Sequence, residues 1–147
     1  MATATKSKTE ALEVRRIFKA PQRRVFEAWT RPDDLKQWAA PGPMSTPLAQ
    51  VDLRVGGAYR IHMRSPDGSE HRVHGIYREV DPPRKLVYTW SWETDPDVQD
   101  SLVTVEFHDR GDSTEIVLRH EGFLTAAKRD RHSEGWAACL EKFGTIV

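Results

Sequence analysis

The sequence predicts an α+β protein in which one antiparallel sheet is covered on a single face by a long C-terminal helix. Between Val51 and Glu121, short segments alternate apolar and polar residues, as do strands with one face on a core and the other in water. From Thr125 to Val147, apolar residues instead recur every three or four positions, which is the spacing of one helix face. Because no other segment predicts a long helix, we expect this helix to pack on the sheet.

The segment before the sheet predicts one strand followed by two short helices. Leu12–Lys19 alternates in the manner of a strand. Pro21 and Pro32 then stand where helices can begin, since proline is tolerated at the first helical position. Each helix would bury one tryptophan, Trp29 in the first and Trp38 in the second.

Three turns predict how the later strands pair. Ser65–Ser69 fits a three-residue hairpin loop with Gly68 at the left-handed position, and further turns are expected at Asp81–Arg84 and at Arg110–Gly111. The pairs predicted from these turns are Tyr59 with Gly75, Ile61 with Val73, Met63 with His71, Gly75 with Trp90, Tyr77 with Tyr88, Glu79 with Leu86, Val103 with Leu118, and Val105 with Ile116. The long connection from Glu93 to Asp100 does not fix a register, but pairing Trp90 with Val103 joins apolar to apolar residues.

These pairs place the apolar side chains on one common face, which a slip of one residue in any hairpin would mix with the polar face. The predicted inward face comprises Tyr59, Ile61, Met63, Val73, Gly75, Tyr77, Leu86, Tyr88, Trp90, Trp92, Val103, Val105, Phe107, Ile116 and Leu118. Strict alternation places four polar residues on the same inward face: Arg16, His71, Glu79 and His120. Arg16 and Glu79 either form a buried pair or lie at the rim, and Arg16 and His120 are the polar groups expected to face a ligand.

Two glycines each allow two interpretations. Gly75 is expected between Tyr59 and Trp90, and Gly135 lies in the middle of the C-terminal helix. Either position provides close packing or leaves space for a ligand. We favour close packing at both.

Composition limits the classes of function. The chain has 147 residues, which suits one domain over 11–147 behind a disordered tail over 1–10. Lys plus Arg and Asp plus Glu are equal at 22 each, so the net charge is zero, which argues against binding of nucleic acid. A single cysteine and the lack of an apolar run of membrane-spanning length favour a cytoplasmic protein. Both a monomer and a homodimer agree with the sequence.

Motifs for chemistry are few. No glycine-rich phosphate loop or metal motif is present, so we expect no cofactor and no metal, and we assign no catalytic residue. Of the three nearby histidines, His62 and His74 are predicted to face outward and His71 inward, which disfavours joint coordination. Cys139 lies on the apolar face of the C-terminal helix, where it is expected to act as a small hydrophobic residue.

Several short motifs, in this order and spacing, resemble the family of activator-of-Hsp90-ATPase-homologue-like proteins, within the START/Bet v 1-like (SRPBCC) superfamily. The residues that carry the resemblance are Arg16, Phe18–Pro21, Trp29–Pro32, Gly56–Tyr59, Pro66–Gly68, Gly75–Pro83, Leu86–Trp90, Val103–Phe107, His120–Phe123 and Gly135–Trp136. The resemblance extends from about Leu12 to the end of the chain. It implies a helix-grip fold, in which a curved seven-stranded antiparallel sheet wraps a C-terminal helix and leaves a cavity. It also implies that many small members are lipid- or polyketide-type binding domains.

The leading functional hypothesis is therefore the binding of a small hydrophobic or aromatic molecule between sheet and helix. The residues expected to surround it are Arg16, Trp29, Trp38, Tyr59, Ile61, Met63, Val73, Gly75, Tyr77, Tyr88, Trp90, Trp92, Val103, His120, Trp136 and Leu140. One alternative is an enzyme of cyclase, hydrolase or dehydratase type that uses His120, Glu79 and Arg16. A second alternative, a co-chaperone-like accessory of an Hsp90, rests on the family name alone.

Overall fold

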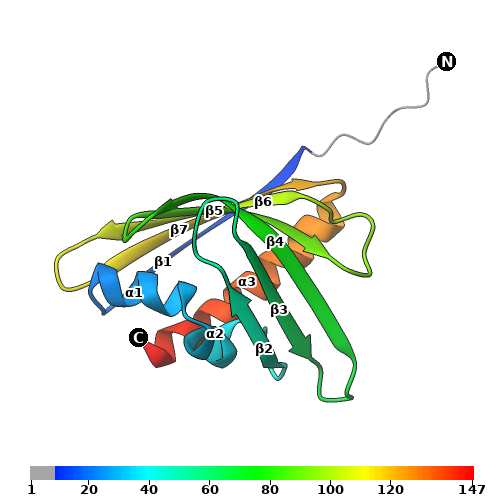
Figure 1. The fold of residues 1–147 in the computed structure, drawn as a ribbon, viewed down its shortest axis with the longest axis horizontal. Helices are drawn as coiled ribbons and strands as arrows, with labels where there is room; N and C mark the ends of the chain where they lie inside the picture. The colour runs from blue at the N-terminus through cyan, green and yellow to red at the C-terminus, as the bar shows by residue number, and fades with distance from the viewer. Residues whose placement is uncertain (1–8) are drawn as a thin grey trace.

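The protein folds as the helix-grip architecture that the sequence predicts (Figure 1). A computed structural model describes residues 9–147. The seven strands form one antiparallel sheet in the order β1-β7-β6-β5-β4-β3-β2. The elements are β1 (Glu10–Phe18), α1 (Gln22–Thr30), α2 (Pro32–Trp38), β2 (Ser45–Val51), β3 (Ala58–Arg64), β4 (Glu70–Asp81), β5 (Lys85–Trp92), β6 (Ser101–Asp109), β7 (Thr114–Phe123) and α3 (Ala126–Ile146).

The long helix α3 begins and ends with side-chain caps. At its start, the Thr125 hydroxyl accepts a hydrogen bond from the Lys128 amide at 3.1 Å, which satisfies one of the amides that a helix leaves free. At its end, the Arg24 guanidinium of α1 donates to the Ile146 carbonyl at 3.0 Å. The predicted apolar face is buried, through Trp136, Cys139, Leu140 and Phe143.

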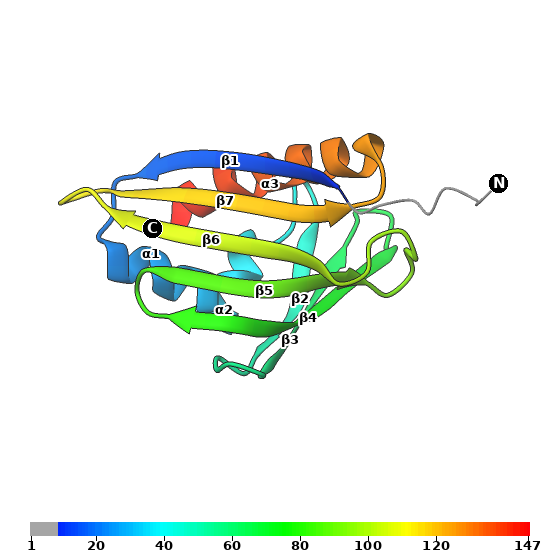
Figure 2. The ribbon, with the colours of Figure 1, turned by 90° about the horizontal axis from the view of Figure 1, so that it is seen from above.

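The position of α3 explains why the interior is not filled. The helix packs mainly against β1, β7 and α2, and Figure 2 shows it running beneath β1 and β7. The strands β3, β4 and β5 belong to the other half of the sheet, which twists away from the helix (Figures 1 and 2). A straight helix therefore covers one half of a strongly curved sheet and leaves space under the other.

The two short helices close one end of that space with aromatic rings. Trp29 of α1 lies 4.5 Å from Trp38 and 5.4 Å from Phe143 between ring centroids. The chain after α2 is tied to α3, because the Lys142 ammonium donates to the carbonyls of Ala40 at 2.6 Å and Met44 at 2.9 Å. This end of the molecule is therefore held by both packing and hydrogen bonds.

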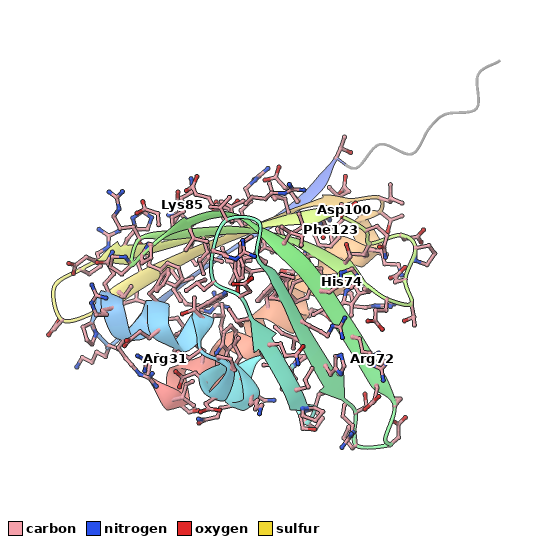
Figure 3. All side chains as sticks on the ribbon, viewed as in Figure 1. Arg31, Arg72, His74, Lys85, Asp100 and Phe123 are labelled. Carbon is pink, nitrogen blue, oxygen red and sulfur yellow. The ribbon has the colours of Figure 1, made fainter. Side chains whose placement is uncertain are left out.

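The predicted apolar face of the sheet is confirmed. Every apolar residue assigned to the inward face is buried, except Trp92, which is half-buried. Arg72 and His74 of β4 are exposed on the side that faces away from α3 (Figure 3). The hairpin of β3 and β4 has the predicted register, with Ile61 opposite Val73, and Gly68 in its loop has a φ of 89°.

Two predicted registers are wrong by two residues. Val103 lies opposite Tyr88, where the matching of apolar residues had predicted Trp90, and opposite His120, where the turn at Arg110–Gly111 had predicted Leu118. The turn between β6 and β7 leaves four residues between the paired Asp109 and Thr114. Because side chains alternate with a period of two, a slip of two keeps every side chain on its face, so alternation cannot detect it.

A third pairing fails because of an irregularity in β4. The register shifts between Tyr77 and Glu79, so Glu79 pairs with Val87 and Val80 with Leu86. The predicted pair of Glu79 with Leu86 is therefore wrong. Glu79 is half-buried and forms an ion pair with Lys85 at 3.4 Å. The bulge turns its carboxylate away from the inward face that simple alternation had assigned to it.

The edge strand β2 lacks the regular alternation that predicts the other strands. Its register with β3 shifts between Ser45 and Leu48, and Pro47 lies at the shift. Proline cannot donate to a ladder, so an edge strand with a bulge is where a sheet accepts it. Because of this break, the alternation of apolar and polar residues does not predict β2.

The beginning of the chain lies partly outside the described residues. Of the expected tail, 1–10, the segment 1–8 is not described, whereas Glu10 begins β1 and forms an ion pair with Arg129 of α3. Within residues 9–147, no helix combines the length and the apolarity needed to cross a lipid bilayer.

Candidate ligand-binding cavity

A cavity of about 400 Å³ lies between α2, α3 and the strands β3, β4 and β5. Its apolar and aromatic lining comes from all of these elements, together with β2 and α1. The lining residues are Trp29, Leu35, Trp38, Ala39, Pro41, Met44, Val51, Tyr59, Ile61, Met63, His71, Tyr77, Tyr88, Trp90, Trp92, Thr94, Asp95, Lys128, Arg131, His132, Gly135, Trp136 and Cys139. A volume of this size is in the range of small-molecule sites.

Three tyrosines from adjacent strands form one wall. The rings of Tyr59, Tyr77 and Tyr88 lie 5.2–5.9 Å apart between centroids. They meet because Tyr77 is directly opposite Tyr88 across β4 and β5, and Tyr59 follows on β3. Such edge-to-face contacts between rings are favourable beyond the area they bury.

The three tyrosine hydroxyls differ in their hydrogen bonds. The Tyr59 hydroxyl donates to the Thr89 carbonyl at 2.6 Å. The Tyr88 hydroxyl accepts from the Trp29 indole at 3.2 Å, and the Tyr77 hydroxyl bonds to no other residue within 9–147. Burial raises the pKa of all three tyrosines, so each hydroxyl keeps its proton at neutral pH.

Two tryptophans follow on β5 with different surroundings. Trp90 is 6% exposed and lies 5.1 Å from Trp136 between ring centroids. Its Nε1 is buried and has no hydrogen-bond partner among the described residues. Trp92 is half-buried, and its Nε1 donates to Nε2 of His132 at 2.8 Å. The binding hypothesis requires the rings of Trp90 and Trp92 to border the cavity, and both do.

A polar rim borders the cavity where α3 begins and the chain after β5 crosses it. Lys128 and Asp95 form an ion pair of 2.7 Å across this rim. Burial by itself raises the pKa of Asp95, but the hydrogen bonds from Lys128 and from the Asp97 amide outweigh it and lower the pKa. Thr94, Arg131 and His71 are exposed members of the same rim.

His132 is held in one neutral form at this rim. Its Nδ1 lies 2.8 Å from the Lys128 carbonyl, and its Nε2 accepts from Trp92. A carbonyl only accepts, so Nδ1 carries the proton and Nε2 does not. Burial lowers the pKa of His132, in agreement with this neutral state.

His120 is fully buried behind the cavity wall and is not among the lining residues. Its Nδ1 accepts from Trp136 Nε1 at 3.1 Å, and its Nε2 lies 2.8 Å from the Ser101 hydroxyl, which donates to the Trp90 carbonyl at 2.7 Å. Both ring nitrogens are therefore in use. Burial, with a smaller contribution from His132, lowers the pKa of His120 well below its ordinary value.

Cys139 lines the cavity as a neutral thiol. Burial raises its pKa to about 12, and the nearby Lys142 only partly offsets this effect. A thiol that stays protonated at neutral pH is a weak nucleophile. Cys139 therefore contributes apolar surface, as expected from its place on the helix.

The two glycines occupy opposite environments. A Cβ at Gly75 would lie 1.9 Å from the Thr89 carbonyl oxygen and 2.7 Å from the Tyr59 ring, so close packing is confirmed there. A Cβ at Gly135 would meet no atom within 4 Å, and Gly135 lines the cavity. Close packing was thus the wrong interpretation of Gly135, because the helix stands away from the sheet at this point.

Residues 19–147 match the family model described as Activator of Hsp90 ATPase homolog 1-like protein. The chain belongs to this family. The family is part of the SRPBCC superfamily, whose Bet v 1-like fold commonly binds ligands. No curated protein gives a significant match.

Solved structures of similar proteins share the fold along nearly the whole chain. A protein from Chromobacterium violaceum is 25% identical with a TM-score of 0.87, and the match covers 93% of this chain and 96% of that one. The AHSA1 protein from Silicibacter pomeroyi is 25% identical with a TM-score of 0.81 over 92% and 96%. An AHSA1-like protein from Aeromonas hydrophila is 23% identical with a TM-score of 0.79 over 92% and 90%.

In this member of the family, most of the residues predicted to surround a ligand line the cavity. These are Trp29, Trp38, Tyr59, Ile61, Met63, Tyr77, Tyr88, Trp90, Trp92 and Trp136. Five others are packed behind the lining: Val73, Gly75, Val103, His120 and Leu140. Alternation along a strand predicts on which face of the sheet a side chain lies. It does not predict whether a larger neighbouring side chain separates it from the cavity.

Arg16 is placed differently from its prediction. Its side chain is exposed and donates to the Arg15 carbonyl at 2.7 Å. Because β1 is an edge strand, a long side chain there can lean past the sheet into water. Arg16 forms no pair with Glu79, since three strands separate β1 from β4.

The residues required by the enzyme hypothesis are consequently not brought together. Arg16 lies at one edge of the sheet, Glu79 pairs with Lys85, and His120 is sealed in the core. General acid–base catalysis needs such groups within hydrogen-bonding reach of one substrate. Within residues 9–147, no three potential metal ligands are grouped either.

The lining residues that sequence analysis missed come mostly from irregular segments and from the first turns of α3. They are Leu35, Ala39, Pro41, Met44, Val51, His71, Thr94, Asp95, Lys128, Arg131, His132, Gly135 and Cys139. The helical spacing of Lys128, Arg131, His132 and Gly135 was a usable signal, since positions three and four apart share a face. The loop residues carry no periodic signal at all.

Proposed function

We propose that this protein binds a small apolar or aromatic molecule, of lipid or polyketide type, in the cavity between α3 and the sheet. The observation that supports it most directly is the cavity of about 400 Å³ with a lining dominated by aromatic rings. An unfilled apolar space destabilises a fold, and a bound molecule of matching shape recovers the lost contacts.

Gly135 offers a direct test, because it lines the cavity and a Cβ there would meet no atom within 4 Å. Gly135→Leu is expected to abolish binding while leaving the fold intact, since leucine also favours a helix more than glycine does. Gly135→Ala is the matched control, because it improves the helix at least as much and adds only a methyl group.

Binding is first measured with N-phenylnaphthylamine, an uncharged dye whose fluorescence rises in apolar sites. Hydrophobic metabolites are then screened by thermal shift and by native mass spectrometry. The wild type and Gly135→Ala should bind the dye and gain thermal stability with at least one compound. Dye binding that persists unchanged in Gly135→Leu, or a fold that no apolar compound stabilises, would contradict the proposal.

A further inference from the structure

We propose that the loop of residues 52–57, between β2 and β3, docks the protein on the surface of an anionic phospholipid bilayer together with Arg60 and Arg78. This interaction lies outside the cavity and does not depend on what the cavity binds. Two features of the same part of the molecule carry it. One is a pair of aliphatic side chains that project into water, and the other is a pair of arginines that no carboxylate neutralises.

Exposed aliphatic side chains are concentrated in this loop. Within residues 9–147, three large hydrophobic residues are exposed, and two of them, Leu53 and Val55, lie here with 38% and 63% of their surface in water. Figure 2 shows the loop between β2 and β3 projecting past β4. A single exposed aliphatic residue, such as Ile17, is ordinary. Two on one projecting loop instead form an apolar tip of the kind that enters a membrane interface.

The loop holds these two side chains in place through contacts of its own. The Gly57 amide donates to the Arg54 carbonyl at 2.8 Å, and the Arg54 guanidinium donates to the Asp52 carboxylate at 2.9 Å. A Cβ at Gly57 would lie 2.0 Å from the Asp52 carbonyl oxygen, so the turn is too tight for a side chain at this position. Because the loop is already folded on itself, Leu53 and Val55 enter an interface with little loss of conformational freedom.

Two arginines stand beside the loop. Arg60 lies opposite His74 across β3 and β4. Arg78 follows Tyr77, whose carbonyl accepts a hydrogen bond from the Gly56 amide of the loop at 2.8 Å. Both arginines are exposed, and neither forms an ion pair or a hydrogen bond with another residue within 9–147.

The acidic residues next to these arginines are already paired. Asp52 is held by Arg54 at 2.9 Å, and Glu79 is held by Lys85 at 3.4 Å. Arg60 and Arg78 therefore remain as uncompensated cations, although the whole chain has no net charge. Near an anionic membrane, each such cation raises the affinity about fivefold.

A bilayer fits this combination better than a folded partner or a nucleic acid does. A stable protein interface buries about 800 Å² on each partner around a centre rich in aromatic anchors, and residues 52–57 contain no aromatic ring. A nucleic acid would neutralise the arginines but would leave the aliphatic tip in water. A bilayer surface accepts both, because apolar groups insert shallowly while cations stay among the headgroups.

The test is co-sedimentation of the full-length protein with vesicles at millimolar lipid. One set contains phosphatidylcholine alone, and the other contains equal parts of phosphatidylcholine and phosphatidylglycerol. The protein should bind the anionic vesicles about tenfold or more tightly than the neutral ones. Added salt should release it, since salt screens the attraction of exposed arginines to the lipid.

Substitutions in the loop test the apolar tip. The double variant Leu53→Ser/Val55→Ser should bind anionic vesicles about tenfold more weakly, because it removes the aliphatic surface that would leave water. Ile17→Ser is the matched control, since Ile17 is as exposed as Val55, at 66%, but lies on the edge strand β1. Its binding should equal that of the wild type.

A fluorescent label reports directly whether the tip enters the lipid. The protein's own thiol, Cys139, is buried, so acrylodan should react with the introduced thiol of Val55→Cys. The emission of this label should shift to the blue with anionic vesicles. The same label on Ile17→Cys should not shift.

Substitutions of arginine test the charge. Arg60→Gln and Arg78→Gln should each weaken binding to anionic vesicles about fivefold. Arg119→Gln is the matched control, because Arg119 is exposed but already paired with Glu121 at 3.0 Å. It lies on β7, three strands from β4 and beyond the range of unscreened charge, so its removal should change binding less than about twofold.

The outcomes that would overturn this inference are distinct from failure of the proposed function. Lack of binding to anionic vesicles, equal binding to both kinds of vesicle, or equal losses in Leu53→Ser/Val55→Ser and Ile17→Ser would each overturn it. Self-association of the free protein that disappears in Leu53→Ser/Val55→Ser would also overturn it, because the loop would then contact a second copy. The dye test with Gly135→Leu concerns the cavity alone and is independent of all these results.

Discussion

At the scale of the residue, glycine has two unrelated roles in this protein. Gly75 is required because the Thr89 backbone and the Tyr59 ring occupy the place of a side chain. Gly135 is not required by packing, since no atom lies within 4 Å of the place where its Cβ would be. The same residue type therefore marks a close contact between β4 and β5 and an open position on α3.

Gly75→Ala is expected to destabilise the protein by about 2–4 kcal/mol, because its Cβ would overlap backbone that cannot move without breaking the sheet. Gly135→Ala is expected to stabilise it by up to ~1 kcal/mol through helix propensity. Urea unfolding followed by circular dichroism measures both changes. Similar effects of the two substitutions would show that the environments assigned to Gly75 and Gly135 are wrong.

At the scale of the element, α3 depends on contacts from distant segments. Arg24 of α1 holds Asp34 of α2 with two hydrogen bonds, at 3.0 and 3.2 Å, and also donates to the last turn of α3. One side chain thus joins three helices at the end of the molecule where α3 ends. A cation at this point also suits the negative end of the helix dipole.

Arg24→Met should lower the free energy of unfolding by about 1–2 kcal/mol, since it removes charge-assisted bonds and leaves a helix carbonyl without its donor. Amide hydrogen exchange should accelerate in the last turn of α3 and little elsewhere. Arg31→Met is the control, because Arg31 forms only an exposed pair with Glu27. Faster exchange confined to α2 would argue against a cap on α3.

At the scale of the whole molecule, two hydrogen bonds from tryptophan to histidine join sheet and helix in opposite directions. Trp136 of α3 donates to His120 of β7, and Trp92 of β5 donates to His132 of α3. Each bond requires a neutral histidine with an accepting nitrogen. The packing of α3 on the sheet is therefore linked to the protonation of both residues.

Stability should consequently fall in mildly acidic solution. The pKa of both histidines lies below the ordinary 6.5 in the folded protein, so the unfolded chain binds protons first as the pH drops. Stability should be nearly constant between about pH 7.5 and pH 8 and decrease below about pH 6.5, by up to ~1.4 kcal/mol per pH unit for each such histidine. It should decrease again at alkaline pH, because the buried Cys139 and the three buried tyrosines have raised pKa values in the folded protein. Protonation of the carboxylates that form ion pairs affects the stability only below about pH 5.

The measurement is urea unfolding at a series of pH values, with His132→Gln as the informative variant and His74→Gln as the control on an exposed position. His132→Gln should reduce the slope between pH 6.5 and 5, although Asp95, Lys128 and Arg131 surround this site and shape its titration. An unchanged slope in His132→Gln would show that His132 does not cause the loss of stability in acid, which His120 alone would then explain.

The sequence by itself determined the faces of the sheet, the extent of α3, the β3–β4 hairpin and the aromatic character of the interior. These follow from periodicity and turn chemistry, which act over a few neighbouring residues. The tertiary structure alone decided the registers of β5, β6 and β7, the bulge before Glu79, the burial of His120, the exposure of Arg16 and the contrast between Gly75 and Gly135. A slip of two residues leaves alternation unchanged, and an empty space depends on how far a straight helix stands from a curved sheet. No local pattern records that distance, because it depends on every element packed between them.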